Sequence, residues 1–250
     1  MVQTFALARF LDLLLRGTEM RMYQAIGMSS ADAAEKAGAI NTALSLEVLV
    51  AGGLILFFLF VRLTLSVEKP NPAQQLAEMI HEGVGDLGEQ VIGHGYERFQ
   101  AFVTCIGLFV LLNNLIGLLS GLIPGVVTPT GLPEVPLALA VLTFIYYNYQ
   151  GIRANGPGYI KQFLGPLPVM APFMFLIEVI SHLARVLSLT VRLYANMFAS
   201  DLLTLVWFSI IPIAVPSVFL GLHFAVSVIQ AFVFMLLAMI YLSMAVSHEH

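Results

Sequence analysis

The stretch EVISHLARVLSLTVRLYANMFASD, from Glu178 to Asp201, places several ionisable side chains inside an apolar segment. It contains two arginines, two carboxylates and one histidine, and neither proline nor glycine interrupts it. Ionisable groups are costly to hold in hydrocarbon, so charges retained in an apolar helix indicate a functional site. This reasoning applies if the segment lies in a membrane, and the composition of the whole chain decides that point.

The composition is that of an integral membrane protein. Of the 250 residues, 59% are hydrophobic and 10% are charged, whereas about 25% of residues are charged in an average soluble domain. The net charge of -4 provides no basic surface for nucleic acid, and the single cysteine, Cys105, excludes an internal disulfide framework. We therefore expect an all-α protein that crosses a bilayer several times.

Five apolar stretches are long enough to be membrane helices. The predicted spans are about 44–67, 99–122, 133–152, 172–211 and 217–246. Glu47 and Arg62 lie near the two ends of the first span, where long side chains can reach the headgroups. The third span closes in three tyrosines that suit an aromatic belt at the membrane surface, namely Tyr146, Tyr147 and Tyr149.

Two further helices are predicted to be amphipathic. Residues 1–43 form a separate N-terminal segment before the membrane domain at 44–250, and charges opposite a leucine-rich face predict an interfacial helix there. These charges are Arg9, Asp12 and Arg16. Residues of about 72–92 carry an apolar stripe and four carboxylates, which predicts a helix lying along the membrane surface.

The fourth predicted span is about twice as long as a bilayer requires. About 40 residues at 1.5 Å each would extend roughly 60 Å, against a hydrocarbon thickness of about 30 Å. Tilts of up to about 40° do not absorb this length. We predict a hairpin of two long, steeply tilted helices at 172–211 and 217–246, the alternative being a break in the first helix near Arg192.

Positive charge predicts how the chain is oriented. Lysine and arginine flank the connections after the first and third spans, which places these connections and the C-terminus in the cytoplasm. The flanking residues are Arg62, Lys69, Arg98, Arg153 and Lys161. The same rule places the N-terminal segment outside, although that segment also carries arginines.

Polar residues of the last two spans fall on defined faces. At about 100° per residue, one face of the fourth span collects Glu178, Ser181, Arg185, Ser188, Arg192 and Asn196. Asp201 projects to the opposite side. One face of the final span collects His223, Ser227, Gln230 and Tyr241. Two polar lines on different sides of Arg192 predict two separate aqueous routes.

Arg192 has no partner in the neighbouring turns of its own helix, because Ser188 and Asn196, one turn to either side, are neutral. Its guanidinium stays protonated, so it needs a carboxylate from another polypeptide or, alternatively, an internal ion pair with Glu178 or Asp201. Other polar residues also have structural alternatives. His182 and His223 fit either a channel or a hydrogen-bonded core, and Asn113 and Asn114 are predicted to make interhelical hydrogen bonds.

Several motifs in this chain resemble one family of membrane proteins. SHLARVLSLTVRLYANMFASDLL at 181–203 and IQAFVFMLLAMIYLSMA at 229–245 resemble the two C-terminal helices of the subunit a family of F-type ATP synthases. NNLIGLLSGLIPG at 113–125 and YNYQGIRANGPGYIKQFLGP at 147–166 resemble its middle spans and loop. The resemblance covers roughly 44–250 and implies the stator channel subunit of the Fo sector, in a bacterial inner membrane or an equivalent energy-transducing membrane.

The resemblance also implies roles for individual residues. Arg192 matches the family's essential arginine, which faces the ion-binding carboxylate of the rotating c-ring. The half-channel candidates are Glu178, Ser181, His182, Ser188, Asn196, Asp201, His223 and Gln230, with Glu178 on the inner route and Asp201 on the outer one. Gly117 stands where some members carry an acidic residue. The implied partners are the c-ring, the peripheral-stalk b subunits and the rest of the F1Fo complex, with no cofactor and no metal.

Two other classes of protein fit the sequence less well. A self-contained secondary transporter would be expected to show two related halves or spans interrupted at corresponding positions, and the sequence shows no such repeat. A membrane-embedded enzyme would need a nucleophile with its base, a metal-ligand cluster or a phosphate loop, and none of these motifs is present. Whether protons or sodium ions pass is not encoded in these residues.

Overall fold

The computed structural model describes residues 21–24, 29–120, 128–156, 159, 171–210 and 214–246. All regular elements in these ranges are helical, which confirms the predicted all-α architecture. They are α2 (Ser30–Leu63), α3 (Pro72–Val91), α4 (Glu97–Ser120), the short 3-10 helix η1 (Pro129–Gly131), α5 (Glu134–Asn155), α7 (Ala171–Ile210) and α8 (Ala214–Val246). The predicted N-terminal interfacial helix lies outside the described residues.

Within the described ranges, five helices contain segments that are long and apolar enough to cross a bilayer. The segments are Thr42–Leu63, Glu97–Leu118, Glu134–Asn155, Ala171–Thr204 and Ser217–Val246. The first of these helices starts well before the predicted span, because Ser29 caps it: the Ser29 hydroxyl accepts a hydrogen bond from the Asp32 backbone N–H at 3.2 Å. Residues 30–43, predicted to belong to the N-terminal segment, are therefore part of α2.

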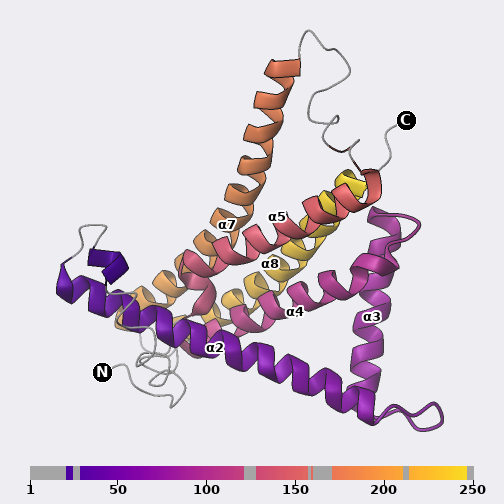
Figure 1. Cartoon of the computed structure of the whole chain (residues 1–250). Coiled ribbons are helices and arrows are strands. Elements are labelled where there is room, and N and C mark those ends of the chain that lie inside the picture. Colours follow the sequence, from indigo (N-terminus) through magenta and orange to yellow (C-terminus); the bar gives the residue numbers. More distant parts are fainter. Residues whose placement is uncertain are drawn as a thin grey trace.

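Helix α3 is the predicted amphipathic helix. It begins at Pro72, whose missing N–H costs nothing in the first helical turn. Gly93 and Gly95, at φ 84° and 91°, then turn the chain into α4. In Figure 1, α3 runs crosswise to α2 and α4 and joins their ends. This crosswise course suits a helix that lies along a membrane surface.

The core is formed where α4, α5, α7 and α8 meet. Val110 of α4, Leu193 of α7 and Phe234 of α8 are completely buried in one apolar cluster. A second cluster includes Tyr147 of α5 and Met239 of α8. Tyr147 is only 2% exposed, so its predicted place in a surface aromatic belt is wrong; α5 turns this ring towards its neighbours.

Helix α7 runs unbroken from Ala171 to Ile210. The alternative of two helices broken near Arg192 is therefore wrong, and α7 forms a hairpin with α8 as predicted. In Figure 1 the first turns of α7 project beyond the other helices. Much of the helix is exposed: Leu183, Leu187 and Val191 keep 58%, 61% and 52% of their surface. One apolar side of α7 thus lacks a partner within the described chain.

Candidate functional site

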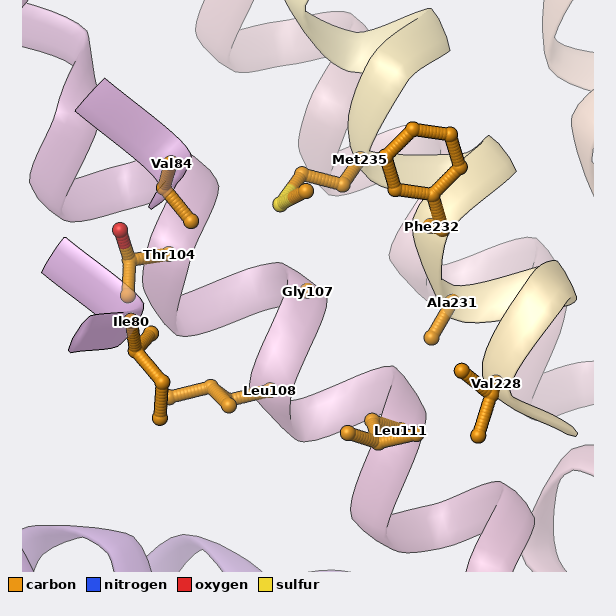
Figure 2. A pocket seen from close by; sticks show the side chains of 10 residues that line it. All are labelled: Ile80, Val84, Thr104, Gly107, Leu108, Leu111, Val228, Ala231, Phe232 and Met235. Atoms are coloured by element: carbon orange, nitrogen blue, oxygen red, sulfur yellow. The ribbon is translucent and has the colours of Figure 1, made fainter. Parts of the chain in front are cut away.

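A hollow of about 180 Å³ between α3, α4 and α8 is apolar. Figure 2 shows Ile80 and Val84 of α3 and Leu108 of α4 on one side, with Phe232 and Met235 of α8 on the other. No lining side chain is ionisable, and Thr104 supplies the only hydroxyl among them. The hollow therefore offers no group for proton or ion chemistry, whereas α7 and α8 both carry ionisable side chains.

Arg192 is half-buried on α7, between the exposed Val191 and the fully buried Leu193. Among the described residues it forms no ion pair. The two carboxylates considered as internal partners are engaged elsewhere, Glu178 with His182 and Arg185, and Asp201 with His223. The alternative of an internal ion pair for Arg192 is therefore wrong. Its permanent charge remains at the edge of the exposed side of α7.

One turn after Arg192, Asn196 connects α7 to α8. Its side-chain amide donates a hydrogen bond of 2.8 Å to the Oε1 atom of Gln230, which is 3% exposed. Asn196 itself is exposed, as is Ser188 one turn before Arg192. The structure therefore places two predicted site residues beside Arg192 and brings a third, Gln230, to them from the neighbouring helix.

Asp201 lies beyond Arg192 and forms an ionisable cluster with α8. Its Oδ1 atom is 3.7 Å from Nδ1 of His223, which is 1% exposed. The Thr128 side chain, just before η1, hydrogen-bonds to the Asp201 carboxylate. A Cβ atom on Gly117 would lie 2.7 Å from Cγ2 of Thr128 and 3.1 Å from Nε2 of His223. The absence of a side chain at Gly117 therefore lets α4 and the η1 segment close around this Asp201 cluster.

The two neighbouring asparagines of α4 behave differently. Asn114 donates from Nδ2 to the Ser227 backbone carbonyl at 3.5 Å, and the Ser227 hydroxyl donates to the Asn114 carbonyl at 3.5 Å. The predicted interhelical bonding is confirmed for Asn114. Asn113 instead donates to the Phe109 carbonyl of its own helix at 2.8 Å, so that prediction is wrong for Asn113. The Asn114–Ser227 contact holds α4 against α8 one turn from His223.

Glu178 lies on the other side of Arg192 and forms a second ionisable cluster. Its Oε1 atom is 3.3 Å from Nδ1 of His182 and 4.0 Å from a terminal nitrogen of Arg185. The Arg185 guanidinium lies over the Tyr241 ring of α8 at 5.6 Å. His182 is buried against Tyr147 of α5, with 5.9 Å between ring centroids. The Glu178 cluster thus joins α5, α7 and α8.

Two aromatic residues near the Glu178 cluster were not predicted as site residues. Tyr147 belongs to the predicted aromatic belt of the third span, and Tyr159 lies in the connection after α5. Burial raises the pKa of the Tyr159 hydroxyl, and this hydroxyl donates a hydrogen bond of 2.9 Å to Oδ1 of Asn148. Their position relative to the site depends on contacts between distant segments, for which the local sequence carries no signal.

The two clusters lie on opposite sides of Arg192 along α7. At about 1.5 Å per residue, Glu178 lies roughly 21 Å and Asp201 roughly 14 Å from Arg192 along the helix axis. Each cluster pairs a carboxylate with an imidazole, two groups that can accept and release protons. Arg192 cannot lose its proton at any physiological pH. The arrangement is therefore one fixed positive charge between two separate groups of proton carriers.

Comparison with known proteins gives a consistent result. Residues 45–243 match the family model described as ATP synthase A chain. The chain is 47% identical over 212 residues to the ATP synthase subunit a of Koribacter versatilis, covering 84% of this chain and 85% of that protein. It is 42% identical over 207 residues to the subunit a of Solibacter usitatus, covering 82% and 87%. It is 41% identical over 181 residues to that of Geobacter sp. (strain M21), covering 72% and 77%.

Proposed function

Because this chain belongs to the ATP synthase A chain family, we propose that its two ionisable clusters are two offset proton half-channels separated by Arg192. Proteins of this family are the non-catalytic, proton-translocating stator subunit of the Fo sector. They work in the membrane with the c-ring, the b subunits and the rest of the rotary complex. The alternative that this chain is a self-contained secondary transporter is not supported by this family membership.

The observation that carries this proposal is the state of Arg192. It is a permanent cation with no carboxylate partner among the described residues, at the edge of an exposed apolar side of α7. A charge of this kind in a membrane requires an opposite charge. A carboxylate of the c-ring, passing along this side of α7, supplies that charge for the part of each turn in which it is ionised.

The outer half-channel is assigned to the Asp201 cluster together with Gln230. A proton arriving from outside passes through Asp201 and His223 and neutralises a ring carboxylate, which then moves into lipid. Ser188 and Asn196 line the path beside Arg192, where the ring carboxylate receives or gives up its proton. This assignment is supported by polar groups on three elements that lie together: the half-buried Asp201 of α7, the buried His223 of α8 and the buried Thr128 of the η1 segment.

The inner half-channel is assigned to the Glu178 cluster, with Ser181 and His182. A ring carboxylate that approaches Arg192 after nearly a full turn is stabilised in its ionised form and releases its proton here. The fixed charge of Arg192 also opposes direct proton passage between the two routes. The membrane potential contributes about 2.3 kcal/mol per charge per 100 mV.

The direction of these routes follows from the positive charges of the connections. Arg62 closes α2, and Arg153 lies in the last turn of α5. By the positive-inside rule these ends are cytoplasmic, which places the start of α7, with Glu178, and the end of α8 on the cytoplasmic side. A bacterial inner membrane fits this arrangement.

Replacing Arg192 tests the proposal directly. We expect Arg192→Ala to abolish ATP synthesis by the whole complex in membrane vesicles, because the ring carboxylate loses its counter-charge and protons leak between the routes. Arg153→Ala, at an exposed position of α5, is the matched control and keeps the activity. Substantial ATP-driven proton pumping by Arg192→Ala would refute the proposed function.

A further inference from the structure

Several buried polar atoms at one end of the bundle lack a hydrogen-bond partner among the described residues. They are Oε1 of Glu47, Oδ1 of Asn113, Oδ1 of Asn114, Oγ1 of Thr130, Oε2 of Glu134 and Nε2 of His223. Native proteins rarely leave such atoms unpaired, and ordered water commonly pairs with the buried polar groups that the protein itself leaves unsatisfied. Their concentration around one region therefore indicates a hydrated passage there.

The contacts of η1 place these atoms near the Asp201 cluster. This short helix packs against α2, α4, α5 and α7. Gly131, its last residue, lies beside the Asp201 carboxylate: a Cβ atom there would be 3.3 Å from Oδ2. Thr130, the preceding residue, is completely buried. The η1 segment thus connects the Asp201 cluster to the helices that surround it.

Helix α2 approaches the same region through one short stretch. Buried residues of this stretch are Thr42, Ala43, Ser45, Leu46 and Val50. Apart from α3, which meets its other end (Figure 1), the main neighbours of α2 are α4 and η1. Glu47 belongs to this stretch, and its Oε1 atom is inaccessible to solvent. Glu47 as a residue is half-buried, so one of its carboxylate oxygens lies in the packed part of α2 while the residue remains partly accessible.

Glu47 differs from Glu134, the other carboxylate with an unpaired oxygen in this region. Glu134 lies in the first turn of α5, where free backbone N–H groups and the helix dipole favour a negative charge. Glu47 lies within the α2 helix, where the backbone N–H groups are already bonded to carbonyls of the preceding turn. A local structural role therefore accounts for the buried carboxylate oxygen of Glu134. No such role accounts for the buried carboxylate oxygen of Glu47.

We propose that Glu47 is a proton-carrying residue of the outer route, located on α2 and upstream of the Asp201 cluster. Its carboxylate takes a proton from water on the outer side and becomes neutral. It then releases that proton to water held among Thr130, Asn114 and His223, which regenerates the carboxylate. The proposal rests on the proposed function, because it requires the Asp201 cluster to be a half-channel.

The first test measures ATP synthesis by the whole complex in vesicles under an imposed proton gradient. Glu47→Gln keeps the shape of the side chain and removes the titratable group, so we expect a loss of about tenfold, equivalent to a barrier raised by about 1.4 kcal/mol. Glu47→Asp should restore most of the rate. Glu68→Gln, at an exposed position after α2, is the control.

A second test asks whether water reaches position 47, and it also covers the case in which Glu47→Gln assembles poorly. In a Cys105→Ser background, Glu47→Cys should be inhibited by a water-soluble thiol reagent. Val48→Cys is the matched control, because the neighbouring residue Val48 is 49% exposed on the surface of the same helical turn. We expect this control, facing lipid, to resist the reagent.

The outcomes separate this proposal from the function on which it rests. If Glu47→Gln keeps the parental rate while Asp201→Asn loses it, the proposal for Glu47 is overturned and the half-channel stands. If Asp201→Asn also keeps the parental rate, the half-channel assignment itself fails. Insensitivity of an assembled Glu47→Cys complex to the reagent likewise overturns the proposal, because it shows a dry site.

Discussion

Adding one methyl group at Gly117 should obstruct the outer route. The Cβ atom of Gly117→Ala would lie 2.7 Å from Cγ2 of Thr128 and 3.1 Å from Nε2 of His223, whereas carbon atoms in contact are normally about 3.5–4.0 Å apart. The overlap with Thr128 is therefore about 1 Å. Thr128 is buried at 2% exposure and His223 at 1%, so neither side chain can move into open space.

Overpacking of this kind typically costs about 1–3 kcal/mol. If the strain is relieved by displacing Thr128 or His223 from Asp201, the cost falls on proton transfer. The rate of ATP synthesis should then fall between about fivefold and about 150-fold. We would measure synthesis by the whole complex in membrane vesicles under an imposed proton gradient, normalised to the amount of assembled complex.

Gly53→Ala is the matched control, because Gly53 lies in the apolar part of α2 and a Cβ atom there would meet nothing within 4 Å. Both variants make the same chemical change in a membrane helix, so a general effect of alanine on insertion should appear in both. Equal rates for Gly117→Ala and Gly53→Ala would refute the reasoning, since the close approach at Gly117 would then have no part in proton transfer.

Two further changes probe the site around Arg192. Arg192→Lys should also fail to support ATP synthesis, because an ammonium group does not reproduce the reach and delocalised charge of the guanidinium; normal synthesis would show that any cation suffices. Asn196→Ala removes the donor of the 2.8 Å bond to Gln230 and leaves a buried oxygen unpaired, at a cost of about 1–3 kcal/mol. When the purified complex is heated, the variant chain should dissociate at a lower temperature than the parental chain does. An unchanged dissociation temperature would show that water replaces the Asn196 amide.

Helix ends and polar faces were predictable from the sequence, since both depend on neighbouring residues. Pro72 and the glycines after α3 mark their turns directly, and the absence of proline between residues 174 and 211 predicts the long α7. Periodicity also separated Asp201 from the polar line through Arg192. The start of α2 was missed because its cap, Ser29, precedes a stretch whose polarity resembles that of a surface segment.

Contacts between distant segments were not predictable in this way. Asn113 and Asn114 are about 100° apart on one helix, and only the position of α8 decides which amide meets Ser227. Periodicity likewise gave no sign that Tyr147 faces the Glu178 cluster. The close approach of the Gly117 backbone to the Thr128 side chain depends on how the chain runs between α4 and α5. The sequence therefore predicted which residues carry charge more reliably than it predicted what surrounds them.

Under the proposed function, the lack of an ion pair for Arg192 among the described residues also explains why this chain needs a moving partner. A self-contained transporter must complete its ion site with its own residues, but here the two carboxylates of α7 that flank Arg192, Glu178 and Asp201, are engaged away from it. A counter-charge from a fixed neighbour would neutralise Arg192 permanently and remove its barrier between the routes. A counter-charge that arrives ionised and leaves protonated restores that barrier in every cycle. If the two clusters are half-channels as proposed, both can therefore act on one carboxylate only if the carboxylate that visits Arg192 travels between them.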